Sequence, residues 1–138
     1  MRMRRCAHWK LSFVEQLTKA FHAIMNIMIA LARKKCIPCE GGMPPLASDA
    51  TRVLLRKLDA AWKIIDGKKI RREFRFRNFA DAMNFVNRVA GIAEAQGHHP
   101  DVCIRYNRVD LELWTHAIGG LSENDFIVAA KIDEVVEV

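Results

Sequence analysis

The sequence contains no apolar run that approaches the ~18 residues of a membrane-spanning helix, and it has few cysteines and few acidic residues near its start. A small secreted scaffold would be denser in cysteine than the four found here, Cys6, Cys36, Cys39 and Cys103. We therefore expect free thiols in a reducing compartment, the cytoplasm, and no membrane partner. The 138 residues, of which 51% are hydrophobic, are sufficient for one domain with its own core.

Acidic residues are almost missing from the first part of the chain. Residues 1–35 hold eight Lys or Arg and a single acid, Glu15, whereas residues 36–138 hold fourteen basic and fifteen acidic residues. The net charge of +6 therefore belongs to the N-terminal segment, and the remainder lacks the basic bias of a nucleic-acid-binding domain. Residues 68–77 contain six basic residues, but the alternation of this run favours the solvated face of a strand, so we expect no nucleic-acid partner.

Residues 1–31 are predicted to be an N-terminal extension, and residues 32–138 the folded domain. Three interpretations of the extension remain open: a signal peptide, an organellar transit peptide, or a start site assigned too early, with translation beginning at Met25 or Met28. We favour the last because each targeting feature is weak. The basic stretch is long for a signal peptide and contains Glu15, and it has only one serine, where a transit peptide would have several.

A Cys-x-x-Cys pair, Cys36 and Cys39, could form half of a zinc site or a redox pair. A structural zinc ion needs four ligands, and no second pair of Cys or His stands at a suitable spacing. The following Gly41, Gly42, Pro44 and Pro45 favour a turn-rich loop instead, so we expect no metal.

Hydrophobic periodicity predicts three helices and two hairpins. The helices are expected at residues 49–59, at residues 79–96 and after Ser122, and the strands at residues 62–65, 70–76, 100–106 and 108–115. Two-residue turns at 66–67 and 107–108 join the strands of each hairpin. This order predicts an α+β fold with a single four-stranded antiparallel sheet and three helices on one face.

Local signals mark the ends of these helices. The expected N-caps are Ser48, Asn78 and Ser122. The capping-box partner of Asn78 is expected to be Asp81, and that of Ser122 to be Asp125. Gly97 is expected to follow the last residue of the second helix. The helix at 79–96 has two apolar faces, one through Phe79 and Met83 and one through Phe85 and Val89. One sheet cannot cover both, so we expect a homo-oligomer.

Three of the five histidines, His98, His99 and His116, lie close to the acidic residues Glu94 and Asp125 in the sequence. Histidine, with an unperturbed pKa of about 6.5, exchanges protons near neutral pH. The cluster therefore indicates acid/base chemistry. A zinc ion held by three histidines is the other possibility, but adjacent histidines rarely bind one ion well.

The same stretch resembles the pterin-4a-carbinolamine dehydratases. Their signature is an acidic or polar residue, three residues, His-His-Pro, five residues, an aromatic, nine residues, a His, and an Asp at least eight residues later. Every spacing is met here by Glu94, His98, His99, Pro100, Tyr106, His116 and Asp125. The opening from Cys36 to Leu46 is common in bacterial members, and Trp62, Phe74, Arg75, Phe76 and Phe79 fall where the family has like residues.

The resemblance implies loss of water from a 4a-hydroxytetrahydropterin to give quinonoid dihydropterin, a step in recycling the cofactor of aromatic amino-acid hydroxylases. It implies a pterin substrate, self-association into dimers or tetramers, a functional link to phenylalanine hydroxylase, and no cofactor or metal. By resemblance, His98, His99 and His116 are catalytic. Glu94, Asp125 and Trp62 have a substrate-binding or orienting role, and Glu94 and Asp125 could each orient a histidine. Helix capping explains Asp125 equally well.

Two features leave the function open at this stage. Many family members have an acidic and then a small residue after the third histidine, where this chain has Ala117 and Ile118, which bears on substrate affinity. Animal members also serve as dimerisation cofactors of a homeodomain transcription factor. A non-catalytic regulatory binding module on the same fold is therefore the alternative to the enzyme.

Overall fold

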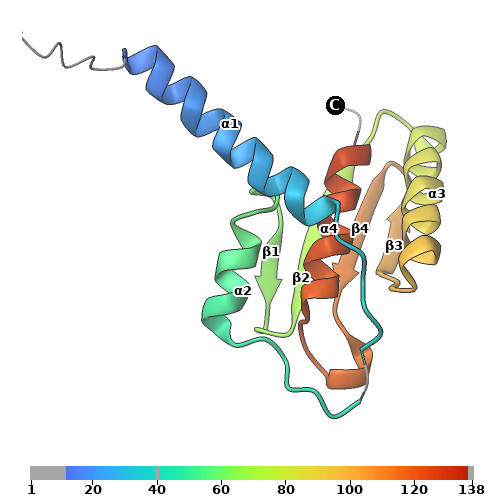
Figure 1. The fold of residues 1–138 in the computed structure, drawn as a ribbon. Helices are drawn as coiled ribbons and strands as arrows, with labels where there is room; N and C mark the ends of the chain where they lie inside the picture. Colours follow the sequence, from blue (N-terminus) through green and yellow to red (C-terminus); the bar gives the residue numbers. More distant parts are fainter. Residues whose placement is uncertain (1–11, 40, 137–138) are drawn as a thin grey trace, which may run out of the picture.

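The computed structural model describes residues 12–39 and 41–136, without the side chains of residues 27–29. In chain order the elements are α1 (Phe13–Ala32), α2 (Ser48–Leu55), β1 (Lys63–Ile65), β2 (Lys69–Arg75), α3 (Phe79–Gln96), β3 (Asp101–Arg105), β4 (Arg108–Leu113), the 3-10 helix η1 (His116–Ile118) and α4 (Glu123–Val135) (Figure 1). The predicted α+β class is confirmed, and α1 is a helix that the sequence analysis did not predict.

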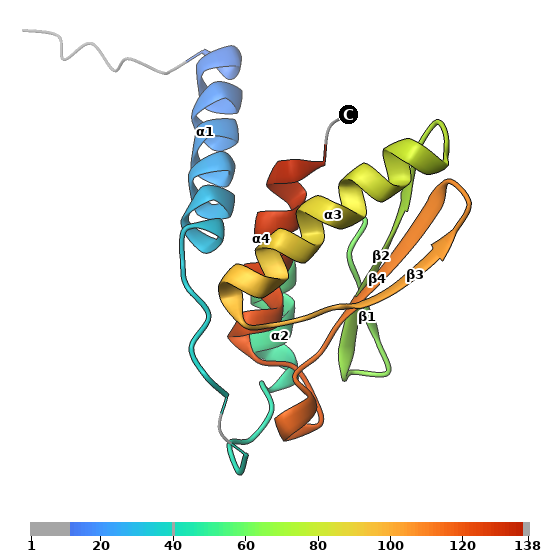
Figure 2. The ribbon, with the colours of Figure 1, turned by 90° about the vertical axis from the view of Figure 1, so that its right-hand side faces the viewer.

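The four strands form one antiparallel sheet, as predicted, and their order in the sheet is β1-β2-β4-β3. The alternating residues Val109, Leu111 and Leu113 of β4 are fully buried. The helices lie on one side of the sheet (Figure 2). Asp110 and Glu112 alternate with these three buried residues along β4. Because successive side chains of a strand point to opposite faces, Asp110 and Glu112 belong to the other face of the sheet.

The charged face of the sheet neutralises much of the basic run at residues 68–77. Lys69 pairs with Glu112 at 3.1 Å, and Arg71 pairs with Asp110 at 3.0 Å. Asp110 is also bonded by Arg105 Nη2 at 2.7 Å. The basic side chains of the strand therefore have acidic partners within the chain.

Helix α4 contacts α1, α2 and α3, and its buried side chains belong to the same hydrophobic core as those of the sheet. Its predicted core residues are all buried, namely Phe126, Ile127, Ala129, Ala130 and Ile132. Helix α3 has the predicted bounds, and Asn78 caps it by accepting a hydrogen bond from the Asp81 backbone N–H at 2.8 Å. The Asp81 carboxylate instead accepts a hydrogen bond from Arg77 Nε at 2.9 Å, so the predicted capping-box role of Asp81 is wrong.

Two predicted boundaries are wrong. Helix α2 begins at Ser48 with Ala47 as N-cap and ends at Leu55, so Ser48 is not the cap and the helix does not reach residue 59. After the helix the chain turns so that the Asp59 backbone N–H can donate to Asp133 Oδ2 at 3.0 Å. That tertiary contact decides where α2 stops, and a local pattern does not contain it.

The second hairpin turn lies one residue earlier than predicted, at residues 106–107. Arg108 pairs with Arg105 of β3 and with Arg75 of β2, so it belongs to the sheet. Tyr106 has the left-handed conformation, with φ 54°. Asn107 is held by Phe76, whose backbone N–H donates to Asn107 O at 2.9 Å and whose carbonyl accepts from Asn107 Nδ2 at 2.8 Å.

The unpredicted helix α1 contacts the domain through its last turn. Leu31 and Ala32 are buried, and Lys131 Nζ on α4 donates to the Ala32 carbonyl. Earlier in the helix, Phe13, Val14, Leu17, Phe21 and Ile24 are all more than half exposed. This part of α1 projects away from the domain in both ribbon views (Figures 1 and 2).

The basic residues on which the targeting interpretations depend, from Arg2 to Lys10, lie outside the described residues, as does Cys6. Over residues 12–39 and 41–136, none of the helices combines the length and the hydropathy of a membrane span.

Candidate active site

The three predicted histidines are brought together where several elements end. Helix α3 stops at Gly97, which takes the left-handed conformation with φ 62°, so His98 and His99 follow directly. Strand β4 ends shortly before η1, which begins at His116. A cleft of about 520 Å³ lies between these ends and is lined by residues 36–39, 96–101, 114–117 and 124. Its volume is within the range of small-ligand pockets.

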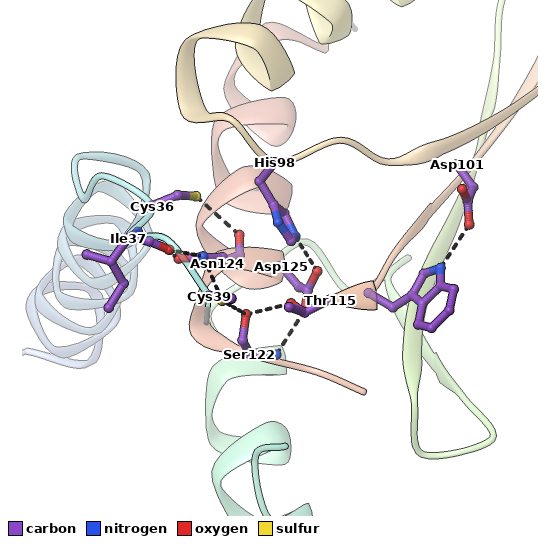
Figure 3. Close-up of polar contacts among 10 residues, drawn as sticks. Cys36, Ile37, Cys39, His98, Asp101, Thr115, Ser122, Asn124 and Asp125 are labelled. Atoms are coloured by element: carbon purple, nitrogen blue, oxygen red, sulfur yellow. Dashed lines mark hydrogen bonds and ion pairs between the residues drawn. The ribbon is translucent and has the colours of Figure 1, made fainter. Parts of the chain in front are cut away.

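His98 is held by a buried carboxylate. Its Nε2 lies 2.6 Å from Asp125 Oδ1, and Asp125 has no exposed surface (Figure 3). The other carboxylate oxygen, Oδ2, accepts from Thr115 Oγ1 and from the Ser122 backbone N–H, both at 2.9 Å. Ser122 and Asp125 form the predicted capping box of α4. The two explanations of Asp125, capping and orienting a histidine, therefore both hold in the geometry.

The contact with Asp125 selects the form of the His98 ring. A carboxylate accepts, so Nε2 of a neutral His98 carries the proton and donates it. The remaining nitrogen, Nδ1, then has a free lone pair that can accept a proton from a ligand. A histidine fixed in this way is suited to act as a general base.

His99 has a similar partner in a different environment. Its Nε2 lies 2.7 Å from Glu94 Oε1, in the last turn of α3. Both side chains are largely exposed, 59% for His99 and 79% for Glu94. Water screens such a pair, so it fixes the ring less firmly than the buried pair does.

His116 has no carboxylate partner among the described residues, and neither of its ring nitrogens is hydrogen-bonded to another group in this part of the chain. Its ring instead stacks on Trp114, with 3.9 Å between the ring centroids and 26° between the planes. Sequence analysis missed Trp114. The sequence did contain a signal for it. Trp114 lies two residues before His116 at the end of a predicted strand, and residues two positions apart in a strand lie on the same face of the sheet.

The loop around Cys36 and Cys39 forms another wall of the cleft. Buried Asn124 accepts from the Ile37 backbone N–H at 3.1 Å and donates to the Ile37 carbonyl at 2.6 Å (Figure 3). Gln96 Oε1 accepts from the Cys36 backbone N–H at 3.0 Å. The loop is thereby fixed to the end of α3 and the start of α4. Sequence analysis missed both anchoring residues, and no local pattern marks them.

The loop also packs closely against the segment before α4. A Cβ atom on Gly120 would lie 2.8 Å from Cβ of Pro45, so this close approach requires glycine. Next to it, the Leu46 backbone N–H donates to the Leu121 carbonyl at 2.8 Å.

The thiols of this loop are not arranged as a metal site. Burial raises the pKa of the Cys36 thiol to about 11, although Lys131 partly lowers it. Cys36 is therefore a neutral and weakly nucleophilic thiol at neutral pH. Over residues 12–39 and 41–136, no three His, Cys, Asp or Glu side chains are grouped so that they could hold a metal ion.

The structure does not bring Trp62 to the cleft. Its side chain is 2% exposed, and Nε1 donates to Asp133 Oδ1 at 2.7 Å. Arg72 Nη1 also lies 2.7 Å from that oxygen. Burial raises the pKa of Asp133, and the hydrogen bonds from the Asp59 backbone N–H and from Trp62, together with the charge of Arg72, lower it in part. Trp62 therefore packs in the core rather than against a ligand in the cleft.

The family model for pterin 4 alpha carbinolamine dehydratase matches residues 44–135 of the chain. The chain belongs to this family. The matched segment includes all three histidines, Glu94 and Asp125, and it excludes α1 and the loop at residues 36–39.

Individual relatives agree with the family match. The chain is 48% identical over 108 residues to a protein of Rubrobacter xylanophilus, covering 78% of this chain and 100% of that protein. It is 53% identical over 108 residues to a protein of Nitrosospira multiformis, covering 78% and 94%. Both are provisionally named pterin-4-alpha-carbinolamine dehydratases.

A solved structure from Brucella melitensis, described as a transcriptional coactivator/pterin dehydratase, is also similar. It is 37% identical and aligns with a TM-score of 0.62, covering 65% of this chain and 96% of that one.

Proposed function

We propose that the protein removes water from pterin-4a-carbinolamine, a 4a-hydroxytetrahydropterin such as 4a-hydroxytetrahydrobiopterin, and gives quinonoid dihydropterin. The observation that carries the proposal is the histidine cluster of one cleft, in which His98 is fixed by buried Asp125 while His116 keeps both ring nitrogens free of other described groups. The proposal is also supported by the family to which the chain belongs, because that family is described as pterin 4 alpha carbinolamine dehydratase.

The reaction needs one proton donated and one accepted. The C4a–O bond breaks as the hydroxyl oxygen gains a proton and leaves as water. The N5–H bond gives its electron pair to a new C4a=N5 double bond, and its proton passes to a base. No electrons enter or leave, so we propose that the enzyme, a hydro-lyase, uses no redox cofactor.

The environments of the histidines suggest a division of these roles. His98 donates from Nε2 to Asp125, so its Nδ1 is the group that accepts the N5 proton. His116, which is exposed, donates the proton to the leaving hydroxyl, because either of its nitrogens can reach a ligand or water. His99, held only by exposed Glu94, binds or orients the pterin ring.

The second candidate is a non-catalytic regulatory binding module. It is favoured by one observation, the description of the similar Brucella melitensis protein as both transcriptional coactivator and pterin dehydratase. The two candidates differ in what they require. Only the enzyme needs the ionisable groups of the cleft, whereas a binding module needs only its surface.

We also propose the context in which the enzyme acts. It serves a pterin-dependent hydroxylase such as phenylalanine hydroxylase, in the cytoplasm, and works as a homo-oligomer. Support for association comes from exposed apolar side chains on the domain, including Phe79 at 51%, Val102 at 42% and Ile104 at 36%. We further propose that residues 1–24 of the extension are dispensable for the activity of the domain at residues 32–138.

A coupled assay tests the proposal. A pterin-dependent hydroxylase generates the 4a-carbinolamine, and the decay of its absorbance is followed with and without the purified full chain. We expect the decay rate to rise in proportion to the protein concentration, above the uncatalysed rate. A decay rate that stays at the uncatalysed value at all concentrations would exclude the enzyme and favour the binding module.

A further inference from the structure

The three histidines of the cleft are held in two different ways. His98 and His99 each contact a carboxylate, Asp125 and Glu94 respectively, through Nε2. Among the residues that the structure describes, the His116 ring is contacted only by the stacked Trp114 indole, and stacking leaves both imidazole nitrogens at the ring edge. A carboxylate partner would have occupied one of those nitrogens.

The indole is itself fixed from two other strands. Trp114 Nε1 donates to Asp101 Oδ2 at 2.9 Å, and Asp101 begins β3 directly after the His98-His99-Pro100 segment. Lys69 Nζ, from the start of β2, lies 5.0 Å from the centroid of the indole ring. Trp114 is half-buried, so three elements of the sheet determine the plane against which His116 rests.

We propose that Trp114 is the positioning residue of His116 and that Asp101 fixes the indole that does this. The inference rests on the proposed function, because the ring being positioned is the proposed proton donor. Stacked aromatic pairs prefer defined offset arrangements, so the indole restricts the tilt of the imidazole without using either nitrogen. His116 can then present one nitrogen to the leaving hydroxyl and exchange protons with water through the other.

Steady-state kinetics of the full chain separates positioning from substrate contact. If Trp114 positions His116, Trp114→Leu lowers kcat on the order of ten- to a hundredfold and leaves KM within about threefold, since misplacing a reacting group costs about that much. A rise in KM with kcat kept would show that the indole contacts the substrate instead, and would overturn the inference.

Two further variants keep the test decisive if Trp114→Leu does not fold. Trp114→Phe retains an aromatic face but loses the bond to Asp101, so its kcat should lie between that of Trp114→Leu and that of the wild-type protein. Asp101→Ala removes the same bond from the other side and should resemble Trp114→Phe. Phe21→Leu changes an exposed aromatic of α1, far along the chain from the cleft, and serves as the matched control with unchanged kinetics.

A measurement that needs no activity tests the stack itself. In an NMR spectrum of the histidine ring protons, assigned with His116→Gln, the His116 signals should be shifted upfield by the indole and should move downfield in Trp114→Leu. If the wild-type protein shows this shift but no dehydration, the proposed function fails while the stack stands. If the wild-type protein is active and Trp114→Leu keeps its kcat, or if the upfield shift is absent, the positioning role is wrong.

Discussion

His98 Nε2 and Asp125 Oδ1 lie 2.6 Å apart, and the carboxylate in this pair is fully buried. The same carboxylate closes the capping box at the start of α4 and accepts from Thr115. One residue therefore links the central helix of the core to a ring of the cleft. The first turn of α4 cannot move without moving His98, so folding and the position of the proposed base are coupled.

This coupling predicts that Asp125→Asn lowers both the dehydration rate and the stability. The amide offers one acceptor oxygen where the carboxylate offers two, so one of its three donors, His98, Thr115 or Ser122, faces an N–H₂ group. The free energy of unfolding should fall by about 1–3 kcal/mol. The rate should fall on the order of ten- to a hundredfold, less than the ~10²–10⁴-fold of a whole acid/base group.

Glu94→Gln is the matched control for that variant, because it changes the exposed carboxylate that contacts His99. Urea unfolding and steady-state kinetics of the two variants should differ, with the Gln variant within about 0.5 kcal/mol of wild type. Equal losses of stability and of dehydration rate in the two variants would mean that the buried Asp125–His98 contact contributes no more than the exposed Glu94–His99 contact.

The N-terminal part of α1 should be dispensable, and its last turn should not. The described part of residues 1–24, from residue 12 onward, has only exposed side chains, so removing residues 1–24 should leave the melting temperature and turnover unchanged. In the full chain, Leu31→Ala removes a buried side chain and should cost about 2–5 kcal/mol of stability. Leu17→Ala, on the same helix but 54% exposed, should cost almost nothing. A large loss from the truncation would show that the extension is integral to the domain.

The purified chain should be a homo-oligomer. Helix α3 buries Ala82, Phe85 and Val89 but leaves Phe79 half exposed, and the apolar side chains of edge strand β3 are also exposed. Uncovered apolar surface and a free strand edge both favour association. Light scattering should give at least twice the chain mass of 15.8 kDa, and a monomer at micromolar concentration would contradict this.

Cys36 should react slowly with alkylating reagents, and its rate should rise with pH. Its pKa of about 11 lies above the ordinary thiol value because burial disfavours the thiolate. On the order of one thiol in a thousand is then ionised at pH 8, and the fraction grows tenfold for each pH unit. Peptide mapping after iodoacetamide treatment should show exposed Cys103 modified before Cys36.

The same experiment addresses the expectation of a metal-free protein. Because no three His, Cys, Asp or Glu side chains of the described residues are grouped to hold a metal ion, a chelator should change neither the labelling order nor the dehydration rate. Rapid labelling of Cys36 that does not depend on pH, or activity lost on chelation, would contradict the proposed state of the loop.

The parts of the fold that local chemistry determines were predictable from the sequence. Asn78 and Gly97 delimit α3, and Ser122 with Asp125 begins α4, because caps satisfy backbone groups within a few residues. The turn at Asp66 and Gly67 was predicted for the same reason, and both residues have positive φ.

What the sequence did not predict depends on contacts between distant residues. Asn124 holds a loop 87 positions earlier, and Trp62 finds its partner Asp133 71 positions later. The latter contact places Trp62 in the core, although the family resemblance suggested a role near the substrate. Helix α1 was missed because its apolar residues were interpreted only as part of an extension. Its position depends on Leu31 and Ala32 packing against α4.

The central claim is that the histidines of the cleft transfer the protons of the dehydration. It is tested most directly by the 4a-carbinolamine decay rate for His98→Ala, His116→Ala and the double variant, each confirmed as folded by its melting curve. Each single variant should lose up to ~10²–10⁴-fold, with the observable loss limited by the uncatalysed reaction. The double variant should fall to the uncatalysed rate rather than to the product of the two losses, because the two groups act as a unit. Turnover of the folded double variant near the wild-type value would contradict the account and leave the binding module as the better explanation.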